Sequence, residues 1–163
     1  MEKQDKIRLL FVCLGNICRS PAAEGIMKDL VQREGLENKF FIDSAGTGGW
    51  HTGELPDARM RRHGEKRGYD FCSRARKFRA ADFDDFDYII VMDEENFQDV
   101  NAYATSEEDV RKIRRMTDFS QKYTHDYVPD PYYSGADGFE LVLDLLEDAT
   151  EGFLGELKTV HSL

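Results

Sequence analysis

Cys13 and Arg19 are the two residues whose types and spacing most directly suggest chemistry, and they bracket the segment Cys13-Leu-Gly-Asn-Ile-Cys-Arg19. A thiolate is a strong nucleophile, and a guanidinium can donate two parallel N–H groups to two oxygens of one phosphoryl group. A cysteine held in line with a clamped phosphate would displace the leaving oxygen and form a phosphocysteine intermediate. Neither of the other two cysteines has an arginine at this spacing.

The residues around this pair predict a strand, a tight turn and a helix start. The branched and aromatic run Ile7–Val12 is typical of a central strand, and a Gly-Asn pair then marks a turn. Ser20 and Pro21 are residue types preferred where a helix begins. Backbone N–H groups and the helix dipole would converge beside Cys13, where they favour a bound anion and the thiolate form of the cysteine.

Release of an ester oxygen from phosphorus also requires an acid that protonates it. The best candidate is Asp130, which stands between two prolines in Val128-Pro-Asp-Pro-Tyr-Tyr133. Prolines on both sides restrict the backbone and exclude a regular element, so the carboxylate would lie on a stiff loop. We therefore expect Asp130 at the mouth of the anion site, although it is distant from Cys13 in the sequence.

The two motifs together resemble those of the low-molecular-weight protein tyrosine phosphatases. Asp43-Ser-Ala-Gly-Thr47 and Met92-Asp-Glu-x-Asn96 fit the same family at the expected places, so the resemblance spans nearly the whole chain. It implies Cys13 as nucleophile, Arg19 as phosphate clamp and Asp130 as general acid. The other residues it implies are Leu14, Gly15, Asn16, Ile17, Cys18 and Ser20 in the phosphate-binding loop, with Ser20 as hydroxyl donor to the thiolate, Ser44 as loop support beside Asn16, and Leu14, Ile17, Trp50 and Tyr132 as walls of a slot for an aryl ring.

Strand-like and helix-like segments alternate along the chain, which predicts an α/β fold. We expect a doubly wound open sheet of about four parallel strands with helices on both faces, flavodoxin-like or phosphotyrosine phosphatase I-like, in a single domain over residues 1–163. The anion site would lie at the carboxyl end of the first strand. Expected strands are 7–12, 39–44, 87–92 and 112–116; the first expected helix begins at Ser20, and the others span 56–67, 94–104 and 136–157.

Composition and charge are typical of a cytoplasmic protein. The chain has 163 residues, 40% of them hydrophobic, which suffices for one core. The charged start and short apolar run predict neither a signal peptide nor a membrane span. A net charge of −10 disfavours nucleic acid as a partner, and three cysteines do not make a secreted disulfide framework. We expect a monomer that acts on a tyrosine-phosphorylated protein without a metal or other cofactor.

Charge is unevenly distributed along the sequence. Residues 59–79 hold nine Lys or Arg and two acidic residues, whereas residues 82–109 hold eleven acidic residues and no Lys or Arg. Two solvated helix faces explain this pattern most simply. The alternative is that the basic segment attracts anionic substrates toward the pocket.

Four positions near the motifs allow more than one interpretation. Cys18 is either an inert buried thiol or a partner that captures oxidised Cys13 as a disulfide, and relatives with this pair suggest the second. Trp50, in a loop rich in glycine and threonine, is either a packed aromatic or a residue of the pocket lip, and we expect the second. Tyr132 and Tyr133 are pocket walls, phosphorylation targets or plain surface, and the resemblance favours the first, at least for Tyr132.

Two further positions bear on the order of the loop. Many relatives have a histidine after the basic helix that supports the loop asparagine, and the ungapped match here is Ser73. A serine reaches less far than an imidazole, so we expect a looser or water-bridged support of Asn16. Asp93 is interpreted either as a carboxylate that orders nearby loops or as a helix cap.

Other activities occur with similar loops. Phosphoarginine phosphatases resemble this motif but have threonine in place of Ile17, and isoleucine offers an apolar wall for an aromatic ring and no hydroxyl, which favours phosphotyrosine. Thiol-coupled arsenate reductases use additional cysteines, and only Cys72 is available beyond the loop pair. A silent phosphopeptide-binding module would not need Cys13, Arg19 and Asp130 together.

Overall fold

A computed structural model describes residues 5–163 of the chain. Four parallel strands, β1 (Ile7–Cys13), β2 (Phe40–Gly46), β3 (Tyr88–Val91) and β4 (Ile113–Arg115), form one sheet in the order β2-β1-β3-β4. The chain passes from β1 to β2 on one side and then crosses to β3 and β4 on the other. The connections therefore diverge at the carboxyl ends of β1 and β3, where ligands bind in folds of this kind. The predicted doubly wound α/β sheet is confirmed.

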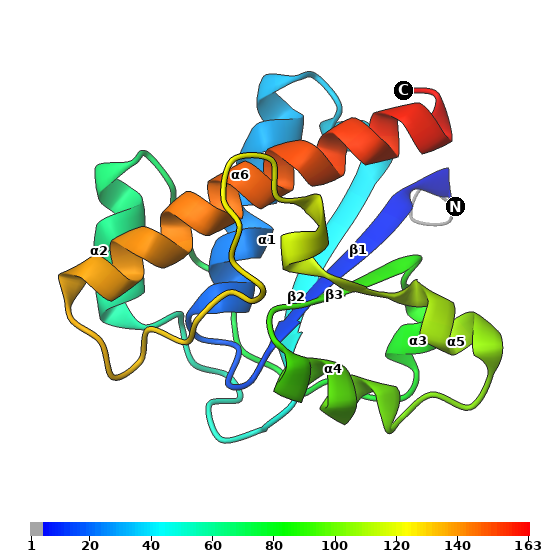
Figure 1. The fold of residues 1–163 in the computed structure, drawn as a ribbon, viewed down its shortest axis with the longest axis horizontal. Coiled ribbons are helices and arrows are strands. Elements are labelled where there is room, and N and C mark those ends of the chain that lie inside the picture. The colour runs from blue at the N-terminus through cyan, green and yellow to red at the C-terminus, as the bar shows by residue number, and fades with distance from the viewer. Residues whose placement is uncertain (1–4) are drawn as a thin grey trace.

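Helices cover both faces of this sheet (Figure 1). α1 and α6 lie together on one face, α3 and α4 lie on the other, and α2 packs beside the amino-terminal part of α6. No helix within residues 5–163 is both long enough and apolar enough to span a membrane. The helices are α1 (Arg19–Arg33), α2 (Ala58–Lys66), α3 (Asp82–Asp85), α4 (Glu94–Asn101), α5 (Glu107–Lys112) and α6 (Ala136–His161), with short 3-10 helices η2 (Glu37–Lys39) and η3 (Met116–Phe119).

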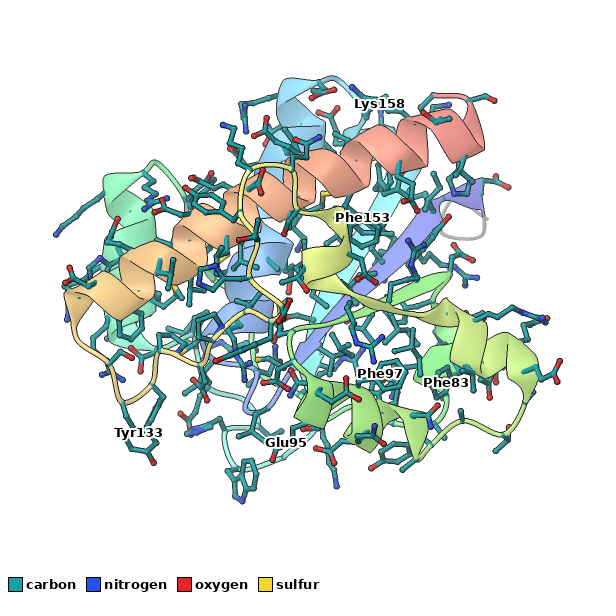
Figure 2. All side chains as sticks on the ribbon, in the orientation of Figure 1. Phe83, Glu95, Phe97, Tyr133, Phe153 and Lys158 are labelled. Atoms are coloured by element: carbon teal, nitrogen blue, oxygen red, sulfur yellow. The ribbon has the colours of Figure 1, made fainter. Side chains whose placement is uncertain are left out.

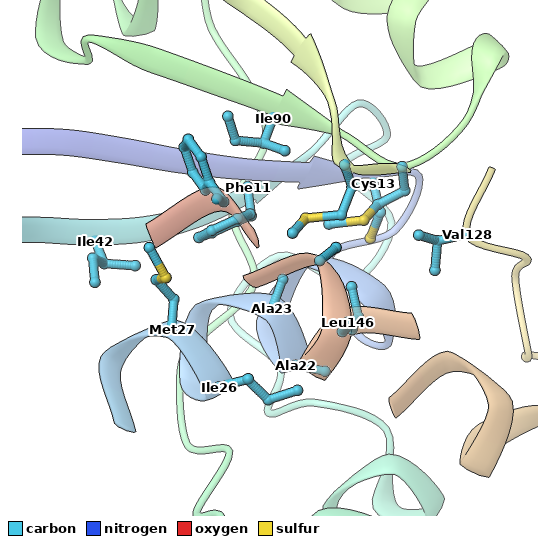
Figure 3. Packing of buried hydrophobic residues seen from close by; sticks show 14 of the residues in the cluster. Phe11, Cys13, Ala22, Ala23, Ile26, Met27, Ile42, Ile90, Val128 and Leu146 are labelled. Carbon is cyan, nitrogen blue, oxygen red and sulfur yellow. The ribbon is translucent and has the colours of Figure 1, made fainter. Parts of the chain in front are cut away.

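The alternating side chains of β1 divide the core into two clusters. Leu9 and Phe11 pack in the cluster formed with α1 and α6, whereas Leu10 and Val12 pack in the cluster formed with α3 and α4. A parallel strand buried on both faces must be apolar at successive positions, which explains the continuous run that precedes the motif. Cys13 continues the first row to the end of β1, beside α1 (Figure 3).

Helices α1, α2, α4 and α6 differ from the sequence prediction at one or both ends, and α4 ends at Asn101 and not at the predicted position 104. α1 begins at Arg19, and its N-cap position is Cys18 with no side-chain cap, so Ser20 is not the cap. α2 begins after Asp57, whose carboxylate accepts from the Arg59 N–H, and not at Pro56. α6 continues four residues past the predicted end at position 157, to His161. The short helices α3 and α5 were not predicted, because neither is long enough to show an apolar periodicity.

The segment between η3 and α6 is fastened to α6 at two points. The buried carboxylate of Asp148 accepts hydrogen bonds from the backbone N–H groups of residues 121–123. Gly152 lies so close to η3 that a Cβ there would be 1.9 Å from the Phe119 carbonyl oxygen. These contacts fix the start of the loop that carries Asp130.

Candidate active site

The loop after β1 brings the predicted nucleophile to the start of α1. Cys13 ends the strand, and its buried sulfur lies 3.0 Å from Ser20 Oγ and 3.4 Å from the Ser20 backbone nitrogen. Both groups of Ser20 belong to the first turn of the helix, where the helix dipole also favours negative charge. Ser20 therefore directs its hydroxyl toward the sulfur, which is the contact that the family resemblance implied.

Asn16 supports this loop from within. Its backbone has φ of 57°, a left-handed conformation that asparagine tolerates better than most residues. Its Nδ2 donates to Ser20 Oγ at 2.8 Å and to Ser44 Oγ at 3.0 Å, and its Oδ1 accepts from the Arg76 backbone N–H at 3.0 Å. Ser44 is placed as expected. The looser support expected around Ser73 is wrong, because the backbone at Arg76 passes close enough to bind Asn16 directly.

A buried carboxylate sets the direction of the hydrogen bonds in this loop. Ser44 Oγ donates to Glu24 Oε1 at 2.6 Å, and the Glu24 side chain is only 5% exposed. Because an ionised carboxylate can only accept, the Ser44 oxygen is left to accept from Asn16, which also donates to Ser20. The Ser20 hydroxyl hydrogen is then left with two acceptors, the Cys13 sulfur at 3.0 Å and the Ala45 carbonyl oxygen at 3.4 Å, and the sulfur is the nearer. The chain of hydrogen bonds that starts at Glu24 thus turns the Ser20 hydroxyl toward the sulfur.

Arg19 is buried at the floor of the site. Its Nη1 donates to Asp93 Oδ2 at 2.5 Å and to the Val128 carbonyl oxygen at 3.0 Å, and its side chain is 2% exposed. Burial opposes the guanidinium charge, but the Cys13 sulfur and Asp93 outweigh burial and raise the pKa of Arg19. The clamp is therefore permanently charged and oriented from two directions.

Asp93 satisfies both interpretations offered for it. One carboxylate oxygen holds Arg19, and the other accepts from the Asn96 N–H at 2.8 Å and caps α4. The sequence left both interpretations open. The contact with Arg19 depends on β3 lying next to β1, which only the sheet order reveals.

Asp130 lies at the mouth of the site, as predicted. Its Oδ2 is 3.8 Å from Arg19 Nη2, and its Oδ1 accepts from the Tyr132 backbone N–H at 3.1 Å. The side chain is 42% exposed, so it can meet both a substrate oxygen and solvent. An acid that must also activate water needs this kind of position.

A pocket of about 300 Å³ opens over Cys13. Leu14, Ile17, Trp50, Tyr132 and Tyr133 form its apolar lining, and Gly15, Cys18 and Asp130 line it as well. Trp50 is 71% exposed and Tyr133 96%, and Figure 2 shows Tyr133 projecting away from the fold at the tip of its loop. The pocket has a charged floor and aromatic rims, which suit an aryl phosphate.

His51 also lines the pocket, and sequence reasoning did not assign it there. Its Nδ1 lies 3.1 Å from Glu54 Oε1, and a Cβ on Gly15 would meet its ring at 3.1 Å. The sequence signal that could have placed His51 at the pocket was its position next to Trp50. The histidines show no metal-ligand spacing, and that pattern alone gives His51 no role.

Cys18 is a buried thiol at the same pocket. Burial, together with the charges of Asp57 and Cys13, raises the pKa of Cys18 far above its ordinary value. The Cys18 thiol therefore stays protonated at neutral pH.

A doubly wound sheet with a nucleophilic thiol at the switch in strand order is the architecture of a cysteine-dependent phosphatase. The sequence profile described as "Low molecular weight phosphotyrosine protein phosphatase" matches residues 8–162, and the chain belongs to this family. The resemblance seen in the motifs is confirmed.

Comparison with individual proteins agrees with this assignment. The low molecular weight protein-tyrosine-phosphatase YfkJ of Bacillus subtilis is 42% identical over 158 residues, which cover 96% of this chain and 99% of the relative. The protein tyrosine phosphatase of Entamoeba histolytica, crystallised with Hepes in its active site, superposes with a TM-score of 0.93 at 45% identity, covering 96% of this chain and 99% of the other. DARP, a Drosophila arginine phosphatase, superposes with a TM-score of 0.87 at 33% identity, covering 93% and 97%.

Proposed function

We propose that this protein is a protein tyrosine phosphatase that hydrolyses phosphotyrosine through a phosphocysteine intermediate. The observation that supports it most directly is the meeting of Cys13, Arg19 and Asp130 in one pocket with apolar walls. Membership in the family is consistent with this activity. The substrate would be a tyrosine-phosphorylated protein.

In the first step, the Cys13 thiolate attacks phosphorus. Arg19 and the backbone N–H groups of the loop bind the non-bridging oxygens and stabilise the charge that they carry in the transition state. Asp130 donates its proton to the phenolic oxygen as the P–O bond breaks. The products are free tyrosine hydroxyl and phosphocysteine.

In the second step, water replaces the tyrosine product. Asp130, now ionised, accepts a proton from this water as its oxygen attacks phosphorus and the P–S bond breaks. Ser20, already hydrogen-bonded to the sulfur, stabilises the departing thiolate. Inorganic phosphate leaves and the starting state is restored.

Phosphoarginine is the second candidate substrate, because an arginine phosphatase has the same fold. Ile17 in the pocket wall argues against it, since its side chain packs against rings and cannot hydrogen-bond a guanidinium. The deciding experiment compares matched phosphotyrosine, phosphoarginine and phosphoserine peptides in chelator and reductant, with Cys13→Ser as the blank. Preference for phosphotyrosine that vanishes in the blank is expected. Preference for phosphoarginine would keep the mechanism and change the substrate.

A redox role of Cys18 belongs to the same proposal. Because Cys18 and Cys13 border one small pocket, oxidised Cys13 would be captured as a disulfide before further oxidation. Activity lost to peroxide should then return fully with a thiol reductant, and return incompletely in Cys18→Ser. Equal recovery of the two proteins would contradict this role.

The basic segment 59–79 contributes less to substrate attraction than its composition implies. Arg59, Arg67, Arg76 and Arg79 all form ion pairs with acidic side chains of this chain. Much of the positive charge of this segment is therefore neutralised by neighbouring acidic side chains. This favours the simpler interpretation, in which the charges belong to solvated helix faces. A cytoplasmic, monomeric, single-domain protein over residues 1–163 remains our expectation.

A further inference from the structure

Arg59, in the first turn of α2, lies between two aromatic rings. Its guanidinium carbon is 5.3 Å from the ring centre of Tyr132 and 4.9 Å from that of Phe139. Tyr132 belongs to the loop of Asp130, and Phe139 belongs to the first turns of α6. A cation over the face of an aromatic ring is attracted by the ring's quadrupole, so Arg59 draws the loop and the helix toward α2.

Arg59 is itself held rigidly by Asp57. Its Nε lies 3.0 Å from Asp57 Oδ1 and its Nη2 2.8 Å from Asp57 Oδ2, a two-pronged contact that fixes the plane of the guanidinium. The Asp57 backbone N–H donates to the Ile17 carbonyl oxygen at 2.8 Å. Arg59 is therefore anchored, through one residue, to the phosphate-binding loop.

The Asp130 carboxylate is oriented from the same side. Its Oδ1 accepts from the Tyr132 N–H, so the position of Tyr132 sets the direction of the acid. Tyr133, the next residue, is 96% exposed, and its ring makes an edge contact with the Tyr132 ring. Arg59 thus contacts the loop at the residue that orients Asp130.

Contacts of other residues also hold α2 against α6. Arg67 pairs with Glu140, Asp144 and Glu147 of α6, and His63 stacks on Phe139 and hydrogen-bonds Glu140. Arg59 adds a contact with Phe139 of α6 and, unlike Arg67 and His63, a contact with Tyr132. Its specific effect is therefore expected on the acid loop and not on the packing of the helices.

We propose that Arg59 is a positioning residue for the general acid: anchored to the phosphate-binding loop by Asp57, it holds Tyr132 and thereby keeps Asp130 directed at the leaving oxygen. This inference rests on the proposed role of Asp130. It links the two halves of the site by a chain of contacts that runs from Ile17 to Asp130 through Asp57, Arg59 and Tyr132.

The test uses two substrates that differ in their need for an acid. Phosphotyrosine releases a phenol whose pKa is about 10, whereas 4-nitrophenyl phosphate releases a much more acidic phenol that departs without full protonation. Arg59→Met should lower kcat/KM for a phosphotyrosine peptide about tenfold and leave that for 4-nitrophenyl phosphate within about twofold. The control is Arg62→Met, an exposed arginine of the same helix, which should change neither.

Asp130→Asn separates failure of this inference from failure of the proposed mechanism. It should lower kcat/KM for phosphotyrosine by roughly a hundredfold or more with a much smaller effect on 4-nitrophenyl phosphate, and Arg59→Met should add no further substrate discrimination in that background. No discrimination in Asp130→Asn would overturn the assignment of the acid. Discrimination there but equal losses on both substrates in Arg59→Met would overturn the role of Arg59 alone.

If Arg59→Met does not fold to a native state, a conservative variant provides a second test. Arg59→Lys retains the charge near Tyr132 but cannot form the two-pronged contact with Asp57. It should show the same discrimination between substrates at a reduced level, about threefold, with partial recovery relative to Arg59→Met. A lysine variant with equal losses on both substrates would count against the proposal.

Discussion

The Asp93 carboxylate joins the phosphate clamp to the start of α4. One of its oxygens lies 2.5 Å from Arg19 Nη1, and the other accepts the Asn96 N–H at 2.8 Å. One side chain at the end of β3 thus fixes the guanidinium and begins a helix. Because β3 is hydrogen-bonded to β1, the clamp and the nucleophile are held by neighbouring strands.

Replacing Asp93 separates these two functions. In Asp93→Asn, the side-chain amide would keep an oxygen that caps α4, but its nitrogen, turned toward Arg19, would donate and not accept. This variant is therefore expected to lower kcat/KM for phosphotyrosine by roughly tenfold or more, with little change in thermal stability. Asp93→Ala should lower kcat/KM by the same factor. It should also lower the free energy of unfolding by about 1 kcal/mol, because the cap of α4 is lost. Normal kinetics in the asparagine variant would contradict this division.

Ser44→Ala tests the hydrogen-bond chain beneath the nucleophile. The buried Glu24 carboxylate and one Asn16 N–H would lose their partner, which costs about 1–3 kcal/mol of unfolding free energy. Alkylation of Cys13 by iodoacetate should also slow, because without Ser44 the Ser20 hydroxyl is less well directed at the sulfur. Ser73→Ala is the matched control, and its stability should change by less than about 0.5 kcal/mol. Equal losses of stability and of alkylation rate in the two variants would mean that Ser73 supports Asn16 as much as Ser44 does.

Two glycines of α6 provide a matched pair for packing. A methyl group at Gly152 would lie 1.9 Å from the Phe119 carbonyl oxygen, whereas one at Gly155 meets nothing within 4 Å. Gly152→Ala should therefore destabilise the protein by about 2 kcal/mol or more, and Gly155→Ala should stabilise it by up to about 1 kcal/mol. Chemical denaturation of both variants measures these differences. An increase in stability in Gly152→Ala would mean that η3 moves away from the added methyl group without loss of free energy.

The raised pKa of the Cys18 thiol predicts a loss of stability at alkaline pH. Burial raises the pKa of its thiol in the folded state, so the unfolded chain loses this proton first, at about pH 8.5. Above that pH the folded state binds more protons than the unfolded state, and stability must fall as the pH rises. The drop in Tm between pH 8 and pH 10 should be smaller in Cys18→Ala than in the unmodified protein. Cys72→Ala, at an exposed cysteine, should leave the drop unchanged.

The fold and the reactive residues were predictable because they depend on local pattern. The apolar run before Cys13 is long enough to identify a buried central strand, and the two motifs name the nucleophile, the clamp and the acid. Trp50 was assigned to the pocket from its glycine-rich loop and from the family resemblance, and it lines the pocket. Each of these signals lies within a few consecutive residues.

The supporting residues were not predictable, because their roles depend on segments that meet only in the folded chain. Glu24 has the appearance of a helix-face charge until β2 places Ser44 against it. Arg59 is one basic residue among nine in its segment, and its contacts with Tyr132 and Phe139 join parts of the chain that are far apart in sequence. Ser20, expected to begin α1, lies one residue inside it, and its hydroxyl lies 3.0 Å from the cysteine sulfur.

Arg19 donates to the carbonyl of Val128, a residue 109 positions further along the chain, and Asp130 follows directly after that contact. During synthesis from the amino end, the nucleophile and clamp therefore emerge long before the acid exists. On the proposed role of Asp130, full turnover of phosphotyrosine requires the segment that contains Val128 and Asp130, because an unprotonated phenolate is a poor leaving group. A nascent or truncated chain that carries the complete cysteine motif but lacks this segment is therefore expected to have less than full phosphatase activity.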